Sequence, residues 1–358
     1  MIGFRVDANE TIATGHMMRC IAIATQCRRQ GMDCLFILAE DKETEKLSDY
    51  GFSYSILNSK WDDMETEKDK MVHLLKEKQI DWLVVDSYQV TASYLQFLNN
   101  LVPVMYIDDM MKEVYSVTAL LHYSQWSEDN FYQKRYAAKE IKLLAGMQFV
   151  PLREEFLPKE QKEKREDSIL ITTGGTDTYN VSCKVLQSLR KEEKFRNYDF
   201  HVIVGSLNQN KKMIMQMQQV DKRIILHENV KNMGSLMRKC RYAVSAGGTT
   251  LYELCACGIP TVCFSFADNQ QSFTYEMGNH KIMYYAGDAR NDDNIGIDIV
   301  HKLCSLLEQP EETKNFVYRM QKLVDGKGTQ RIAEFLKLNV KEEKQINEKN
   351  DTIRKTDN

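Results

Sequence analysis

Residues 241–271 read RYAVSAGGTTLYELCACGIPTVCFSFADNQQ, and this stretch decides the fold. The apolar run Tyr242–Ser245 predicts a short buried strand, and the Gly-Gly pair after it permits a sharp turn of the backbone. Helical character follows over Thr249–Cys257 and ends at a glycine and a proline. The stretch therefore predicts a strand, a glycine turn and a helix, with a second strand beginning at Thr261.

The turn between this strand and helix suits a phosphate or diphosphate. Gly247 and Gly248 have no Cβ atoms, so such a group can approach the backbone closely. Thr249 opens a helix whose free N–H groups and positive dipole end favour an anion. Glu253 lies one turn further on, where its carboxylate can accept hydrogen bonds from the two adjacent hydroxyls of a ribose. A Gly-Gly pair is also a common plain turn, so the surrounding residues decide between the two interpretations.

Polar residues follow the next strand, where open α/β sheets place their ligands. Asn269 and Gln270 could contact the diphosphate or another part of the ligand, whereas the alternative is that Asp268 and Asn269 cap a helix. This combination resembles the nucleotide-sugar site in the C-terminal domain of GT-B proteins, including MurG-like glycosyltransferases. Its parts are the glycine turn, the glutamate, the Gly-x-Pro sequence that ends the helix and the Asn-Gln pair.

Composition limits the classes of partner. The 358 residues predict about two domains, and a net charge of −3 without a basic block argues against nucleic acid. No apolar run approaches the roughly 18 residues of a membrane span, so we expect a cytoplasmic protein without stable membrane association, and a monomer by default. The nine cysteines contain no CxxC pair and are expected to be reduced core residues. Neither a metal site nor a cofactor is expected.

Strands alternate with helices in both halves of the chain, which implies parallel sheets covered on both faces. We expect an α/β, GT-B-like fold in which two Rossmann-like domains face each other across a cleft. The predicted parts are an N-terminal domain over 1–150, a charged linker over 151–167, a C-terminal UDP-binding domain over 168–337 and a disordered tail over 338–358. Strands are predicted over 1–7, 34–38, 54–57, 82–85, 104–107, 119–122 and 141–144, then over 168–172, 201–204, 224–226, 242–245, 261–264 and 282–284.

The loop DANETIATGHMMRC over residues 7–20 is the second strong signal. His16 falls at the first strand-to-helix turn, where an imidazole can serve as a general base, although a loop or capping histidine is the simpler interpretation. Together with the nucleotide-sugar pattern, the loop resembles the opening of the UDP-sugar hydrolases of the PseG/SpsG family. Ala13 and Thr14 depart from the small residues, often glycine, that the family has there.

The resemblance extends over nearly all of residues 1–335. Its other matching places are 85–88, 107–109, 151–153 with Phe156, 174–177, 247–260 and 268–270. It implies hydrolysis of UDP-2,4-diacetamido-2,4,6-trideoxy-β-L-altropyranose at the anomeric carbon, with inversion and release of UDP, as a step of pseudaminic acid biosynthesis. By this resemblance His16 activates the water. The substrate-contacting residues would be Asp7, Gly15, Arg19, Tyr88, Gly174, Gly175, Asp177, Gly247, Gly248, Thr249, Glu253, Asn269 and Gln270.

Several of these residues have a second interpretation. Asp7 and Arg19 could hold the loop and the substrate, or form a local ion pair. Tyr88 could contact the sugar, orient His16 or simply pack. Asp108 and Asp109 could cap a loop or contact sugar hydroxyls.

The leaving group bears on the chemistry. UDP departs as a stable anion, so backbone N–H groups and helix dipoles can suffice without a second carboxylate or a metal. One alternative is an inverting GT-B glycosyltransferase that uses a UDP-amino sugar and in which the histidine deprotonates an acceptor hydroxyl. The polar segments 41–49 and 62–78 do not form the apolar, basic patch of a membrane-facing transferase. Another alternative is a non-catalytic nucleotide-sugar binding protein, which would keep Glu253 but would not need the histidine.

Overall fold

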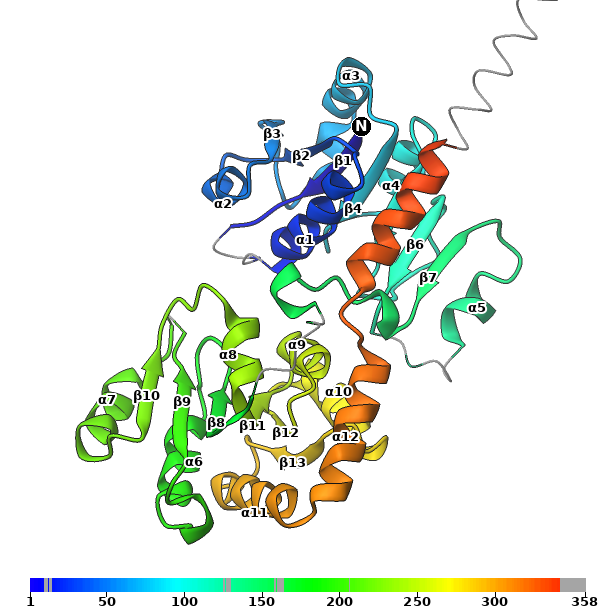
Figure 1. Cartoon of the computed structure of the whole chain (residues 1–358). Coiled ribbons are helices and arrows are strands. Elements are labelled where there is room, and N and C mark those ends of the chain that lie inside the picture. The colour runs from blue at the N-terminus through cyan, green and yellow to red at the C-terminus, as the bar shows by residue number, and fades with distance from the viewer. Residues whose placement is uncertain are drawn as a thin grey trace, which may run out of the picture. The chain divides into compact units, whose positions relative to one another are not determined.

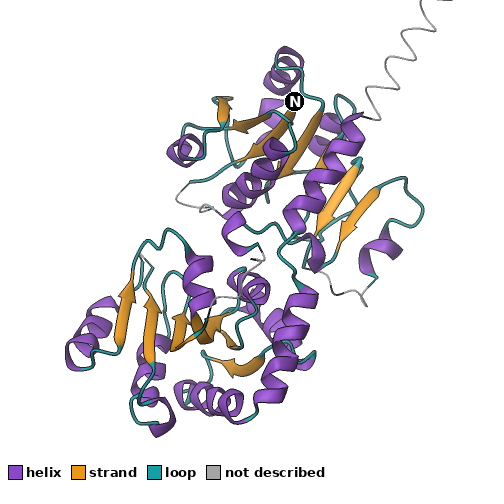
Figure 2. Cartoon of the chain, viewed as in Figure 1, coloured by secondary structure: helices purple, strands orange, loops and turns teal. Residues whose placement is uncertain are grey.

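The computed structural model describes residues 1–9, 12, 15–124, 126, 130–157, 159, 164–205 and 207–341 (Figure 1). The chain divides into two compact units. The N-terminal unit comprises Met1–Arg153 and Lys327–Asn358, and the C-terminal unit comprises Glu154–Gly326. Each unit is a parallel sheet with helices, as Figure 2 shows by secondary structure, so the predicted pair of α/β domains is confirmed.

The N-terminal unit is built on a seven-stranded sheet in the order β3-β2-β1-β4-β5-β6-β7, with parallel pairing throughout. Its central strands are apolar on both faces; Phe4 lies opposite Phe36 on one side and Val84 on the other. Such runs form interior strands because helices cover both faces of a parallel sheet. The strands are β1 Ile2–Val6, β2 Cys34–Leu38, β3 Ser53–Ile56, β4 Trp82–Asp86, β5 Val104–Ile107, β6 Ala119–His122 and β7 Lys142–Ala145.

The helices of this unit include the one predicted after His16. In α1, Met17, Cys20, Ile21 and Ala24 recur at helical spacing and are all buried. The helices are α1 Gly15–Arg29, α2 Thr44–Asp49, α3 Lys68–Glu77, α4 Ala92–Asn99 and α5 Phe131–Arg135, with 3₁₀ turns η1 Met64–Glu67 and η2 Met147–Phe149.

The last described helix, residues 328–341, belongs to the N-terminal unit and not to the C-terminal domain in which residues up to 337 were predicted to lie. Phe335 packs edge-on against Trp82 with ring centroids 5.9 Å apart, and Arg331 donates to the carbonyl of Gln148 at 2.9 Å. The order of elements in the sequence does not indicate that the chain goes back to the N-terminal unit. The predicted disordered tail therefore begins too early, because residues 338–341 are helical, and the remainder of that prediction lies outside the described residues.

The C-terminal unit has a six-stranded parallel sheet in the order β10-β9-β8-β11-β12-β13. Its strands are β8 Glu166–Thr172, β9 Asp199–Ile203, β10 Ile224–His227, β11 Cys240–Ala246, β12 Thr261–Ser265 and β13 Tyr284–Asp288. Its helices are α6 Val181–Leu189, α7 Lys211–Val220, α8 Met233–Lys239, α9 Thr250–Cys257, α10 Asp268–Asn279, α11 Ile295–Glu308 and α12 Pro310–Leu323, with 3₁₀ turns η3 Glu154–Phe156 and η4 Glu193–Phe195. Helix α10 was considered only in the alternative that Asp268 and Asn269 cap a helix; it begins at Asp268, and its N-cap residue, Ala267, makes no side-chain hydrogen bond. Only Thr274 and Met277 are buried along α10, so its apolar pattern is weak, and the strand predicted over 282–284 begins two residues later.

Part of the segment predicted as a charged linker over 151–167 is packed into the C-terminal unit. Phe156 is fully buried, and the carboxylate of Glu155 accepts a hydrogen bond from the N–H of Gly234 at 3.2 Å. Arg165 donates to the carbonyls of Cys240 and Gly258 at 2.7 Å each. One aromatic side chain and two side chains that hydrogen-bond to the backbone are enough to anchor a segment that is otherwise charged.

Candidate functional site

His16 is the second residue of α1, and its imidazole is held by a carboxylate from another strand. Its Nδ1 lies 2.6 Å from Oδ1 of Asp86, the last residue of β4, and the histidine is only 9% exposed. Nη2 of Arg19 also lies 2.9 Å from this Nδ1. The contact with Asp86 is the shorter of the two, and an ionised carboxylate can only accept, so the Asp86 contact favours the tautomer with the ring proton on Nδ1. The Nε2 atom keeps its lone pair and is the position from which a neutral imidazole can take a proton.

Arg19, one turn further along α1, holds the same carboxylate. Its Nε donates to Oδ2 of Asp86 at 2.6 Å and its Nη2 to Oδ1 at 2.5 Å, while Nη1 donates to Asp109 at 2.6 Å and also contacts the hydroxyl of Tyr123. Burial alone would raise the pKa of the Asp86 carboxyl, but the charge of Arg19 and the hydrogen bonds from Arg19 and His16 hold that pKa well below its usual range. Asp86 is therefore ionised at neutral pH.

Tyr88 borders the imidazole. The two rings of Tyr88 and His16 meet edge-on with centroids 4.4 Å apart, and the Tyr88 hydroxyl donates to Asp109 at 3.2 Å. Partial burial and the Asp109 carboxylate raise the pKa of the Tyr88 phenol to about 12. The ring remains 43% exposed, so it contacts the histidine and still presents surface to solvent.

Asp7 serves a different network from the one around His16. Its Oδ2 accepts from Nη1 of Arg5 at 2.5 Å and its Oδ1 from the N–H of Ala39 at 2.7 Å. Arg5 is fully buried and also binds both carboxylate oxygens of Glu67, at 2.7 and 2.9 Å. Asp7 therefore joins the carboxyl ends of β1 and β2, and its ion pair is with Arg5 and not with Arg19.

The adjacent aspartates after β5 have separate tasks. Oδ1 of Asp108 accepts from the N–H groups of Met110 and Met111 at 3.0 and 2.9 Å, and the side chain is fully buried. Asp108 therefore caps a loop, whereas Asp109 contacts Arg19. Asp86 lies in the stretch 85–88 that resembles the family, but no role was predicted for it from the sequence, and Tyr123 was not singled out. A further signal for Asp86 was its position as a carboxylate ending a central strand.

The position of the His16–Asp86 pair follows from the sheet order. Strand β2 lies on one side of β1 and β4 on the other, so the chain reverses its direction of winding between β1 and β4. His16 follows β1 and Asp86 ends β4, which places both at this switch point. Open α/β sheets bind ligands at the carboxyl ends of strands at such a point.

The C-terminal unit has the same kind of switch point between β8 and β11, and a glycine turn follows each of these strands. After β8, Gly174 has φ +78° and both it and Gly175 are exposed. Gly205 packs against Gly175 so closely that a Cβ on Gly205 would lie 2.6 Å from the Gly175 carbonyl oxygen. The backbone of the turn after β8 is therefore accessible at the edge of the sheet where a ligand is expected.

Asp177, which was predicted to contact the substrate, caps a helix in the structure. Its Oδ1 accepts from the N–H of Val181 at 2.8 Å and its Oδ2 from that of Ser182 at 3.3 Å, and the residue is 2% exposed. The carboxylate satisfies free N–H groups at the start of α6, so Asp177 caps this helix and fixes the turn before it.

The turn between β11 and α9 exposes Gly248 and Thr249, and Gly248 has φ +148°. Gly247 lies under α10, where a Cβ would be 2.7 Å from Cγ2 of Thr274. Glu253 occupies the first turn of α9 and is half-buried.

Helix α10 starts directly after β12 and carries the Asn-Gln pair. Oε1 of Gln270 accepts from the N–H of Phe266 at 3.0 Å, so this amide shapes the loop, while Asn269 is exposed. Gly15 is exposed at the start of α1, and Ala13 and Thr14 lie outside the described residues.

Two features are absent from the described residues. No helix among them is long and apolar enough to cross a membrane. No group of three or more histidine, cysteine, aspartate or glutamate side chains in this part of the chain is arranged to hold a metal ion.

Comparison with known proteins covers both the C-terminal unit and the whole fold. Residues 168–290 match the family model described as the glycosyltransferase family 28 C-terminal domain. The structure of MurG from Acinetobacter baumannii aligns with a TM-score of 0.66 at 12% identity, over 94% of this chain and 99% of that one. The fold is thus of the GT-B type.

Two curated relatives are similar in sequence. The pseudaminic acid cytidylyltransferase and UDP-2,4-diacetamido-2,4,6-trideoxy-β-L-altropyranose hydrolase of Helicobacter pylori is 23% identical over 74% of this chain and 44% of its own length. The spore coat polysaccharide biosynthesis protein SpsG of Bacillus subtilis is 21% identical over 47% of this chain and 49% of its own length. The chain spans about half the length of the curated relatives it matches.

Proposed function

We propose that this protein is an enzyme acting on UDP-sugars, and that it hydrolyses a UDP-linked diacetamido trideoxy hexose at the anomeric carbon. The observation that carries the proposal is the His16–Asp86 pair at the switch point of the N-terminal sheet, with Nδ1 engaged at 2.6 Å and Nε2 left to act as a base. The family 28 domain match over 168–290 and the hydrolase named in the Helicobacter pylori relative support the substrate class.

In this reaction the oxygen of water attacks C1 of the sugar while Nε2 of His16 takes a proton from the water. The bond between C1 and the diphosphate oxygen breaks, and UDP leaves with its electron pair. Attack opposite the leaving group inverts the configuration at C1. Asp86 stabilises the imidazolium that forms, because it is buried and ionised beside Nδ1.

The glycine turns after β8 and β11 would hold the diphosphate. Exposed backbone at Gly174, Gly175 and Gly248 provides space for it, and α9 begins immediately after the second turn. Glu253 would bind the ribose hydroxyls from the first turn of α9, and Asn269 is exposed where it can contact the sugar or diphosphate. Arg19 acts through Asp86 as a positioning residue, as does Tyr88 through its ring contact with His16.

A second candidate reaction is transfer of the sugar to an acceptor hydroxyl, which the match to a glycosyltransferase domain favours. The same imidazole would then deprotonate the acceptor in place of water. The two reactions differ in whether an acceptor is required.

The deciding experiment incubates purified protein with the UDP-linked diacetamido sugar without acceptor and follows UDP release, with NMR identification of the sugar product. We expect UDP and the free sugar in equal amounts. His16→Asn should abolish release while UDP binding persists, and His73→Asn, at an exposed side chain of α3, should behave like the parent protein. Absence of UDP release above background, or turnover that appears only with an acceptor, would refute hydrolysis.

A further inference from the structure

A pocket of about 620 Å³ in the C-terminal unit lies apart from the glycine turns. Residues of α10, β13, α11 and α12 line it, and Tyr284, the first residue of β13, is among them. It is therefore at the amino end of β13, whereas the glycine turns follow the carboxyl ends of β8 and β11. Its volume is in the range of small-molecule sites, roughly 300–1,000 Å³.

The walls of this pocket are aromatic. Tyr275 is 58% exposed and meets Tyr285 edge-on with centroids 6.4 Å apart, and Tyr284 packs edge-on against Phe316 at 4.8 Å. Gly278 brings α10 close to β13, because a Cβ there would lie 2.8 Å from Cβ of Tyr285. Aromatic walls with a few polar groups are the usual lining of a site for a ring-shaped ligand.

The charge of the pocket favours an anion. Lys281 and Lys302 line it, and the Lys302 ammonium lies 5.6 Å from the centroid of the Tyr284 ring. Glu312 is the single acid in the lining, and Nη2 of Arg319 already binds it at 2.7 Å. Aromatic faces also attract cations, but two ammonium groups oppose a cationic ligand here.

Amide groups complete the lining. Asn279 and Gln309 each provide a donor and an acceptor, which is what the hydroxyls of a sugar require. We propose that this pocket binds a sugar that carries a carboxylate or a phosphate, at a site distinct from the one for the UDP-sugar. This inference does not depend on the reaction proposed above.

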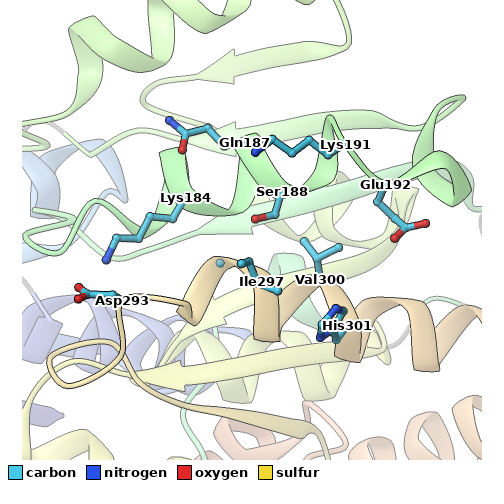
Figure 3. A pocket seen from close by; sticks show the side chains of 10 residues that line it. Lys184, Gln187, Ser188, Lys191, Glu192, Asp293, Ile297, Val300 and His301 are labelled. Atoms are coloured by element: carbon cyan, nitrogen blue, oxygen red, sulfur yellow. The ribbon is translucent and has the colours of Figure 1, made fainter.

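The groove between α6 and α11 lacks this combination. Its volume is about 360 Å³, and it is lined by both acidic and basic side chains. Lys184 and Asp293 lie at one end and Glu192 at the other (Figure 3). Opposite charges in one groove give no preference for an anion, and no tyrosine, phenylalanine or tryptophan lines it.

The test is calorimetric titration of the full chain with glucuronate, with glucose 6-phosphate and with glucose as the uncharged control. We expect saturable binding of at least one of the two acidic sugars and at least about tenfold weaker binding of glucose, because a charge-assisted hydrogen bond is lost. Lys302→Met and Tyr275→Ala should each weaken the acidic sugar by about tenfold. Tyr318→Ala, at an exposed α12 tyrosine that is not part of the lining, should leave its affinity unchanged.

Saturating UDP should not displace the acidic sugar, and all variants should unfold in urea at the midpoint of the parent protein, which shows that they are folded. The inference is overturned if neither acidic sugar binds, if glucose binds equally well, if both pocket variants keep full affinity, or if UDP competes. The carboxylate and phosphate probes separate the two anionic classes.

Discussion

Replacing Asp86 with asparagine tests the mechanism most directly. The carboxylate is 1% exposed and accepts from His16 Nδ1 at 2.6 Å and from Nε and Nη2 of Arg19 at 2.6 and 2.5 Å. An amide of the same shape would present its NH₂ group to the imidazole or to the guanidinium. Opposite the imidazole it forces Nδ1 to become the acceptor, and the ring proton then occupies Nε2, where the water's proton has to go.

Two magnitudes follow. A comparable change at the carboxylate of a Ser-His-Asp triad lowers kcat by about 10,000-fold through the wrong tautomer, and we expect a loss of that order here. Removing one partner of a buried ion pair costs about 3–5 kcal/mol, and the remaining contact of Arg19 with Asp109 places the expected destabilisation near the lower end. KM should change little, because Asp86 is not expected to touch the substrate.

The assay is UDP release under saturating substrate, with denaturant unfolding of the same preparation and calorimetric UDP binding as a check of folding. Asp109→Asn is the matched control, since Asp109 contacts Arg19 and Tyr88, whereas the carboxylate bound to His16 is that of Asp86. It should lose much less activity. If Asp86→Asn retains kcat within about tenfold of the parent value, or if both variants lose the same amount, the orienting role of Asp86 is wrong.

The remaining predictions concern stability, pH and metal dependence. The pKa of Asp86 is lower in the folded than in the unfolded chain. The difference in unfolding free energy between the parent and Asp86→Asn should therefore be full at neutral pH and shrink below about pH 4. Urea titrations at several pH values would show this change, and a constant difference would contradict it. Gly247→Ala should destabilise by about 1–3 kcal/mol, since its Cβ would meet Thr274 and Gln270, whereas Gly15→Ala, with no atom within 4 Å, should not; equal unfolding midpoints would refute this. Glu67→Gln should lower the free energy of unfolding by about 3–5 kcal/mol, because the buried guanidinium of Arg5 loses a charged partner. Glu77→Gln, at an exposed side chain, should leave the unfolding midpoint unchanged. Chelation with EDTA should leave the rate of UDP release unchanged, because the diphosphate leaves as a stable anion. A loss of activity that Mg²⁺ restores would count against this chemistry.

Much of the fold could be predicted because each strand carries its own local signal. The predictions over 104–107 and 119–122 coincide with β5 and β6, since these are short apolar runs that begin after Pro103 and Thr118. Helix α10 could not be found in this way, because a mostly polar helix with two buried residues has almost no apolar periodicity.

The site residues also differ in whether their role has a local signal in the sequence. His16, Arg19 and the glycine turns stand out because strand-to-helix turns and their residue types are visible locally. The role of Asp177 was not visible, because the same carboxylate can bind a ligand or cap a helix, and only its 2.8 Å bond to the Val181 N–H decides between them.

The sequence by itself determined two parallel α/β domains, a glycine turn before α9 and a histidine at the start of α1. Only the tertiary structure decided that Asp86 is the partner of this histidine, 70 residues away in the chain, and that the helix over 328–341 returns to the N-terminal unit. The physical reason is that local periodicity records which side of an element is buried. Which strands become neighbours depends on the order of the sheet, and that order places β4 beside β1.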